Sequence, residues 1–165
     1  MAINEAFIGE LQNEAATTRK VLERIPAETF DWKPHEKSMS MRQLAAHVAD
    51  MFSWYQPTLE EDEMDFAKGY VAPKPADSAE LVAMFDKNVA AAMESLQKTE
   101  DAAFMQNWRL RNGEQIYFEM PKVAVLRSFV MNHIVHHRGQ LSVYLRLNDI
   151  PVPGIYGPSA DEPEM

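Results

Sequence analysis

The stretch LRSFVMNHIVHHRGQLSVYLR, residues 126–146, decides the fold prediction and carries most of the recognisable chemistry of the chain. At about 100° per residue, a helix through it collects six side chains in one stripe facing a core. They are Leu126, Val130, His133, His137, Leu141 and Tyr144. The two histidines stand one turn apart, with Cβ atoms about 5–6 Å from each other. Both imidazoles can therefore reach one metal ion, whose third ligand must come from elsewhere in the chain.

Composition limits the classes of protein to which this chain can belong. Its 165 residues fit one domain spanning 1–165, and it has no cysteine, so any metal must be held by histidine and carboxylate side chains. The N-terminus lacks the basic and apolar regions of a signal peptide, and no apolar run approaches the roughly 18 residues of a membrane span. We therefore expect a cytoplasmic protein without a membrane partner. The formal charge of −9 disfavours a nucleic-acid partner, because phosphate contacts require a basic face.

Apolar spacing predicts four amphipathic helices joined into an all-α, four-helix bundle. Ser40 and Gln43 fit a capping box at the start of the second helix, and residues 57–77 read as a surface loop rich in acidic residues and proline. The predicted helices cover residues 3–24, 41–56, 78–98 and 121–147.

A small β-hairpin is expected between the third and fourth helices. Asn112-Gly113 separates two short apolar runs, and this dipeptide favours a two-residue type I′ turn. The tail from Asn148 is rich in proline and glycine, so we expect it to be extended and frayed.

The chain has five histidines, which differ in their surroundings. His47 lies at the edge of the apolar stripe of the second helix, which makes it the best candidate for a third metal ligand. His136 faces a flank of its helix and His35 lies in a polar loop, so we interpret both as structural or solvated. A hydrogen-bonded core histidine is the alternative at each position, but two on one stripe favour a shared cation that satisfies a nitrogen of each ring.

Several familiar metal and catalytic motifs are absent from the sequence. His133-Ile-Val-His136-His137 has no glutamate after its first histidine, so the zinc-protease helix motif is missing. No Glu-x-x-His pair on two helices suggests a di-iron site, and no phosphate-binding glycine loop or Gly-x-Ser-x-Gly occurs.

Three features together resemble the DinB, or DinB/YfiT-like, family over nearly the whole chain. They are His47 within LAAHVAD, the sequence His133-x-x-x-His137-Arg-Gly-Gln-Leu141, and the hairpin before the last helix. The resemblance implies a four-helix bundle, often a homodimer, in which three histidines bind one divalent cation, usually zinc or nickel. On this chain those ligands are His47, His133 and His137. Despite its name, the family implies no nucleic-acid binding.

Relatives in this family include thiol S-transferases that use bacillithiol, mycothiol or similar low-molecular-weight thiols, and a mycothiol-dependent maleylpyruvate isomerase. A metal on three neutral nitrogens keeps its charge and an open position, where a thiol would be held as thiolate at neutral pH. The best hypothesis is a metal-dependent transferase that joins such a thiol to a small electrophile. The alternatives are a metal-dependent hydrolase and a metal-binding protein without turnover, whose fourth position is closed by a protein ligand such as Asp50.

Five further side chains are candidates for contacts behind the ligands or for pocket walls. Asp50 lies one turn beyond His47, and Gln140 lies one turn beyond His136 or His137. Tyr55, Trp54 and Tyr144 could line a pocket, although each of the five also suits a packing or surface role. Arg138 points away from the metal side and can pair with an acidic neighbour or with the tail.

Overall fold

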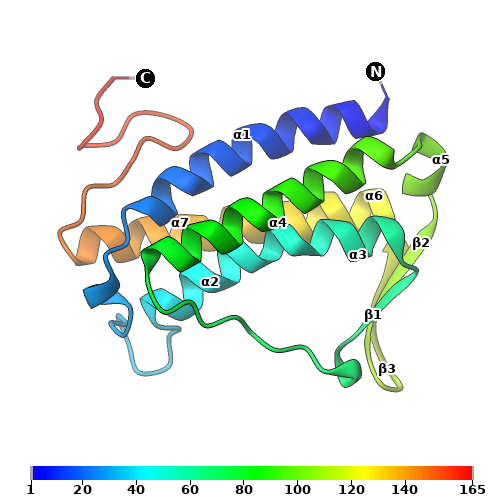
Figure 1. The fold of residues 1–165 in the computed structure, drawn as a ribbon, viewed down its shortest axis with the longest axis horizontal. Coiled ribbons are helices and arrows are strands. Elements are labelled where there is room, and N and C mark those ends of the chain that lie inside the picture. The colour runs from blue at the N-terminus through cyan, green and yellow to red at the C-terminus, as the bar shows by residue number, and fades with distance from the viewer. Residues whose placement is uncertain (1, 165) are drawn as a thin grey trace.

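The computed structural model describes residues 2–164, which form a four-helix bundle with a small sheet at one end (Figure 1). Each main helix packs against two others: α1 and α2 both contact α4 and α7. The predicted all-α bundle is therefore confirmed. The main helices are α1 (Ile3–Glu23), α2 (Met41–Met51), α4 (Ser78–Lys98) and α7 (Asn132–Leu147).

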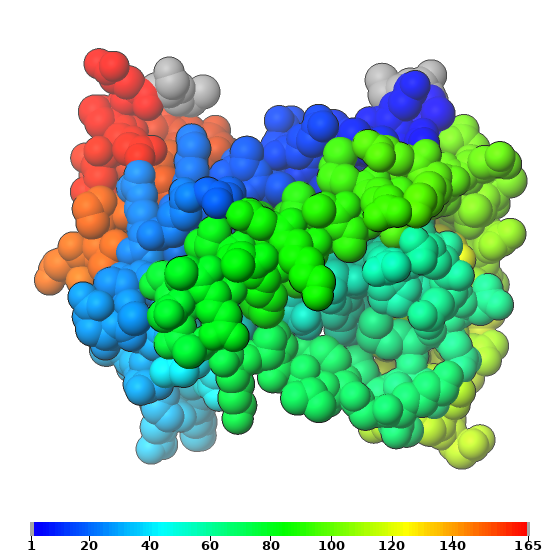
Figure 2. Space-filling view, viewed as in Figure 1, coloured from blue at the N-terminus to red at the C-terminus, as the bar shows by residue number. Residues whose placement is uncertain are grey.

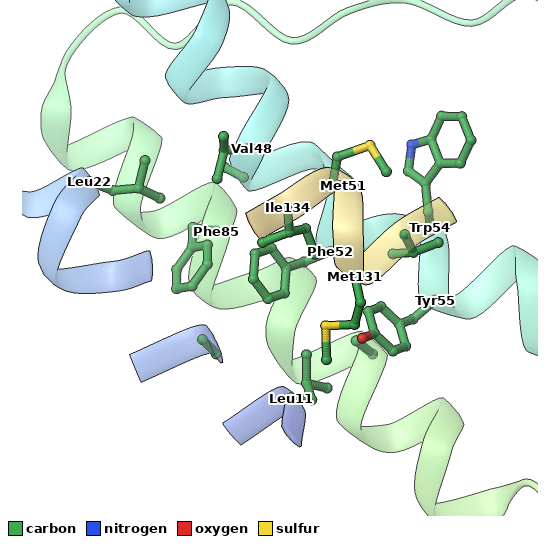
Figure 3. Close-up of a cluster of buried hydrophobic side chains, with 14 of the residues drawn as sticks. Leu11, Leu22, Val48, Met51, Phe52, Trp54, Tyr55, Phe85, Met131 and Ile134 are labelled. Atoms are coloured by element: carbon green, nitrogen blue, oxygen red, sulfur yellow. The ribbon is translucent and has the colours of Figure 1, made fainter. Parts of the chain in front are cut away.

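Apolar side chains from all four helices meet in one core (Figure 3). Phe52 and Phe85 pack edge to face with ring centroids 4.9 Å apart, and Leu11, Met131 and Ile134 lie around them. Burial of each large apolar side chain contributes about 1.5–3 kcal/mol. This core holds α2 and α7 together at the positions where their histidines face each other.

The second predicted helix continues further than expected, in three pieces. After α2, residues 52–54 form a 3-10 turn and α3 (Tyr55–Glu60) follows. Pro57 does not end the helix because it stands in the first turn of α3, where a backbone N–H would have no intrahelical partner. The carbonyl oxygen of Pro57 accepts a hydrogen bond of 3.1 Å from Trp108 Nε1, which attaches α3 to the sheet.

The expected surface loop over residues 57–77 contains a strand as well as the end of α3. β1 (Glu63–Asp65) pairs in parallel with β2 (Asn107–Asn112), and β3 (Gln115–Pro121) pairs antiparallel on the other side of β2. The three residues of β1, two acidic residues around Met64, are too few to give a strand signal of their own. Ion pairs hold β1 in place: Arg111 Nη2 lies 2.6 Å from Glu63 Oε1, and Arg111 Nη1 lies 3.0 Å from Asp65 Oδ2.

The predicted hairpin is present, but its turn is not type I′. Asn112 pairs with Gln115, so the turn residues are Gly113 and Glu114, and only Gly113 has positive φ, at 57°. A type I′ turn requires positive φ at both positions. Tyr117 is an extra residue in β3, because Leu110 pairs with Phe118 and Arg111 pairs with Ile116.

The last predicted helix forms, with a wider turn in its first half. α6 (Lys122–Ala124) leads into a π-helix (Val125–Met131), which leads into α7. The wider turn changes the helix phase, so Ile134, Arg138 and Leu141 occupy the core-facing positions of α7. His133 and His137 are consequently half-buried at the edge of the core rather than in its central stripe, which corrects the prediction.

The C-terminal tail is extended, as expected, but it is not frayed over the residues described. Arg24 pairs with Glu162, and Arg146 Nη2 lies 2.5 Å from Asp161 Oδ2. The tail also delivers Tyr156 to the buried Arg138 side chain. Although the tail has no helical or strand pattern, side-chain contacts hold it against α1 and α7.

The short elements complete the chain. They are 3-10 turns at Ala27–Thr29, Phe52–Trp54 and Phe66–Lys68 and the helix α5 (Asp101–Phe104). Figure 2 shows α1 and α4 running side by side across the upper and central part of one face of the molecule, with the segment after β1 along its lower edge. Across residues 2–164, every helix is too short or too polar to cross a membrane.

Candidate metal centre

The three predicted ligands come together between α2 and α7. His47 extends from α2, and His133 and His137 extend from successive turns of α7. Nε2 of His47 lies 3.1 Å from Nε2 of His133. The three ring centroids are 4.7–4.9 Å apart, and one nitrogen from each ring lies within 4.8 Å of the others.

This arrangement fits a divalent cation. Two nitrogens bound tetrahedrally at about 2.0–2.1 Å from one ion lie about 3.3 Å apart, close to the separation of His47 and His133. Within residues 2–164 the cluster consists of these three histidines alone and does not include Asp50. A donor set of three imidazoles leaves at least one position for another molecule, which is typical of catalytic rather than structural sites.

Burial keeps the three imidazoles neutral and thus able to donate lone pairs. Burial, with smaller contributions from the other histidines, lowers the pKa of His133 from 6.5 to about 4. Burial likewise lowers the pKa of His47, helped by His137, and that of His137 against the opposing effect of its bond to Gln140. Metal ligands must be deprotonated, so these shifts favour cation binding at neutral pH.

Gln140 contacts the outer nitrogen of one candidate ligand. Its Oε1 lies 2.6 Å from Nδ1 of His137. With Nδ1–H donating to this amide oxygen, Nε2 keeps a lone pair that can bind a metal. His136 is exposed and packs edge to face on His137 with centroids 4.8 Å apart, outside the cluster. His35 is exposed and accepts a hydrogen bond of 3.2 Å at Nδ1 from Lys37 N, in agreement with its expected solvation.

Asp50 holds the neighbouring loop rather than the cluster. Its Oδ2 accepts a hydrogen bond of 2.7 Å from the Tyr70 hydroxyl, and its Oδ1 lies 3.4 Å from Ser53 Oγ. Burial and the bond to Asp50 raise the pKa of Tyr70, so this phenol stays a donor at neutral pH. The carboxylate also opposes the lowering of the His47 pKa. Asp50 thus connects α2 to the segment after β1.

The predicted aromatic wall residues divide between the pocket and the core. Trp54 lines a cavity next to the histidines. Tyr55 does not: it is fully buried among Leu11 and Met131, and Figure 3 shows it pointing into the core. Its position follows from the 3-10 turn at the end of α2, which gives consecutive residues different directions from those of a continuous helix.

Tyr144 also lies outside the cavity wall but supports it. Its hydroxyl donates a hydrogen bond of 3.1 Å to the carbonyl oxygen of Met39, a residue that lines the cavity. Its ring packs edge to face on Trp32, with centroids 5.4 Å apart. Tyr144 therefore fixes the segment before α2.

The cavity beside His47 and His133 has a volume of about 450 Å³ and is mainly apolar. Such a volume suits a small molecule. Its walls come from α2 and the segment before it, the 3-10 turn after α2, the segment after β1, β2, the π-helix and α7. The lining residues besides the two histidines are Met39, Gln43, Trp54, Phe66, Tyr70, Ala72, Pro73, Lys74, Leu110 and Phe129.

Some of these residues could have been found from the sequence. Gln43 precedes His47 by one helical turn, and Phe129 precedes His133 by four residues, so helical spacing places each on the side of its histidine. Phe66 and Tyr70 belong to a segment without periodicity. Their position depends on β1 and on the bond between Tyr70 and Asp50, neither of which has a sequence signal.

Comparison with known proteins agrees with the fold and with the resemblance noted in the sequence. The uncharacterized proteins YrdA and YjoA of Bacillus subtilis (strain 168) are 26% identical over 156 residues and 23% identical over 146 residues, respectively. These matches cover 94% and 88% of this chain, and 89% and 91% of the relatives.

Solved structures show the same fold. A DinB-like protein from Bacillus cereus ATCC 10987 superposes with a TM-score of 0.73 at 22% identity, covering 94% of this chain and 98% of that one. Bacillus subtilis YjoA superposes with a TM-score of 0.68 at 18% identity, covering 86% and 90%. The DinB family model matches residues 1–165, so the chain belongs to the DinB family.

Proposed function

We propose that the chain is a metal-dependent enzyme of the thiol S-transferase type, which joins a low-molecular-weight thiol to a small electrophile. The observation that carries the proposal is that three neutral histidine nitrogens converge beside an apolar cavity of about 450 Å³. The polar cluster supplies a cation site, and the cavity supplies room for a substrate beside it. A purely structural metal site would have no use for that room.

His47, His133 and His137 would hold one divalent ion, zinc or nickel by the donor set, with Gln140 fixing the His137 ring. Such an ion supplies a lowered pKa to a thiol or water that it binds, so that a nucleophile is available at neutral pH. In the overall reaction the thiol sulfur bonds to the electrophilic carbon, the S–H proton passes to water, and the leaving group departs with its bonding electrons.

The remaining residues bind and position the reactants. Trp54, Phe66 and Phe129 form apolar walls that exclude water from the electrophile. Tyr70 holds its segment against α2 through Asp50, which keeps the cavity covered on that side. The donor set also allows hydrolysis or metal binding without turnover, but Asp50 is occupied by Tyr70 and Ser53 and is not placed to close the fourth position.

The first test is elemental analysis of protein purified without chelator or metal-affinity resin. We expect about one zinc or nickel per chain in the wild type, and loss of that metal in His47→Ala. His35→Ala is the matched control, because it removes an exposed histidine outside the cluster and should keep the metal. Metal retained by His47→Ala would overturn the assignment of the site.

The second test separates turnover from binding. Metal-loaded protein is incubated with a panel of small electrophiles, with and without added low-molecular-weight thiols, and consumption of the electrophile is followed. Product formation that requires a thiol supports the transferase. Product formation without thiol supports hydrolysis, and the absence of product with bound metal supports a binding protein.

A further inference from the structure

The histidine cavity adjoins a second cavity, which is lined by charged and polar residues. The two share Gln43 and Lys74 among their lining residues, and the second has a volume of about 410 Å³. Its other lining residues are Asp31, Lys33, Ser40 and Arg42. A single molecule can therefore extend from the histidines into this outer region.

The charges of the outer cavity are unbalanced. Lys33, Arg42 and Lys74 carry three positive charges against the single negative charge of Asp31. Asp31 lies 3.2 Å from Arg42 Nη2, and its side chain is 93% exposed, so solvent screens that pair. Lys33 Nζ donates to the carbonyl oxygen of Glu36 and not to a carboxylate. A net positive cleft stands out on a chain whose formal charge is −9.

Lys74 is the residue that joins the two environments. It is the cation that lines the apolar cavity, and it belongs to the segment after β1 that Tyr70 holds against α2. None of the ion pairs made within residues 2–164 involves Lys74, so its ammonium group remains available to a ligand. An apolar cavity with one well-placed charge selects ligands by that charge.

From this juxtaposition we infer that the site takes an anionic amphiphile: a small molecule with an apolar, reactive end beside the histidines and a carboxylate, sulfonate or similar anion beside Lys74. The inference deepens the proposed function by naming the charge of a substrate, and Lys74 is its specificity-determining residue. Clefts lined by one sign of charge concentrate ligands of the opposite sign.

The test uses two fluorescent probes with the same ring system and metal-free protein. 1-Anilinonaphthalene-8-sulfonate is anionic, whereas N-phenyl-1-naphthylamine lacks the sulfonate. We expect the wild type to bind the anionic probe more tightly, and this preference to weaken with added salt. Lys74→Gln should weaken binding of the sulfonate about twofold and Lys74→Glu about fivefold or more, with the neutral probe unchanged.

Two further variants locate the effect. Lys87→Glu makes the same charge change at an exposed lysine on α4 outside both cavities, and it should leave both probes unchanged. Ala72→Trp fills the apolar cavity and should weaken both probes. Equal affinities of the wild type for the two probes, equal losses in the Lys74→Glu and Lys87→Glu variants, or unchanged binding in Ala72→Trp would each overturn the inference. Because the readout needs neither metal nor turnover, failure of the transferase assay would leave this result standing.

Discussion

Two consecutive residues of α7, His137 and Arg138, belong to polar clusters of opposite kinds. Arg138 is 1% exposed, and its guanidinium donates to Thr18 Oγ1 at 3.0 Å and to the Tyr156 hydroxyl at 2.5 Å, and pairs with Glu14 Oε2 at 2.6 Å. The Tyr156 hydroxyl donates in turn to the Glu14 carboxylate. The positive charge of Arg138 is thus balanced, and its hydrogen bonds are made, by groups of the protein itself.

The histidine cluster differs because the protein itself does not supply hydrogen-bond partners for all of its ring nitrogens. Burial keeps the three imidazoles neutral, and each turns one nitrogen toward the other two. On the outer side, Nδ1 of His137 is bonded to Gln140. A buried polar group with all its bonds made internally supports the fold. The Nε2 atoms of His47 and His133 instead face each other at 3.1 Å. Histidine nitrogens that converge in this way beside a cavity mark a place for a ligand.

The largest expected effect is a loss of stability on substitution of Arg138. Arg138→Leu leaves the Glu14 carboxylate buried without its cation, so the free energy of unfolding should fall by about 3–5 kcal/mol. Urea denaturation monitored by circular dichroism measures the change. His137→Leu, at the next position, should lower stability by no more than about 1 kcal/mol, because its side chain is half-buried and not part of an ion pair.

If Arg138→Leu does not fold, Tyr156→Phe tests the same network more gently. It removes the hydroxyl that joins Arg138 to Glu14 and should lower the free energy of unfolding by about 1–2 kcal/mol. Equal destabilisation in the Arg138→Leu and His137→Leu variants would show that the two clusters do not differ as described.

On the side of the histidines, Gln140→Leu removes the acceptor that orients His137. Zinc affinity, measured by competition with a chromogenic chelator, should fall about tenfold, since loss of such outer contacts typically lowers metal affinity 10–100-fold. Gln140→Glu retains an oxygen acceptor and should keep most of the affinity. Unchanged affinity in the leucine variant would exclude a positioning role for Gln140.

The pH dependence of metal-free stability sharpens the comparison further. The pKa of His133 is lowered from 6.5 to about 4 in the folded protein, so between these values the unfolded chain binds more protons than the folded one. The free energy of unfolding should therefore decrease as the pH falls from 6.5 to 4 and show no contribution from His133 above about pH 7. His133→Ala should have a shallower pH profile, whereas an equal slope would assign the effect to other groups.

The smallest expected effect concerns the segment that covers the cavity. Tyr70→Phe removes the hydroxyl bonded to Asp50, so amide exchange over residues 66–74 should accelerate while global stability changes by less than about 1 kcal/mol. Hydrogen exchange followed by mass spectrometry measures this. Tyr117→Phe is the control, because Tyr117 contacts Phe66 through its ring, with centroids 6.2 Å apart. Identical exchange in the two variants would mean that the phenol does not hold the segment.

Patterns that repeat along the chain predict well in this protein, and contacts between distant segments do not. Helical spacing predicts the bundle and places His47 and the pair on α7 on facing helices. Helical spacing gives the wrong core-facing residues for α7, because the π-helix before it rotates the helix face and no residue type in the sequence predicts a π-helix there. Tyr55 is likewise misassigned, since the 3-10 turn before it redirects its side chain.

Charge pairing explains the remaining differences between expectation and structure. β1 depends on Arg111, which lies 48 residues from Glu63. The ordered tail depends on Arg24 and Arg146, and the position of Tyr70 depends on Asp50. These charged and polar residues can be recognised in the sequence, but the sequence does not predict which of them form a pair in the folded protein.

The contact between Tyr156 and Glu14 also bears on how the protein folds. These residues are 142 positions apart, and Tyr156 lies within the last ten residues of the chain. The buried charges of α1 and α7 therefore acquire this partner only from a segment that follows all four main helices in the chain. Contacts between residues so far apart in the sequence form slowly, so we expect the network around Arg138 to close late in folding, after the helices have packed.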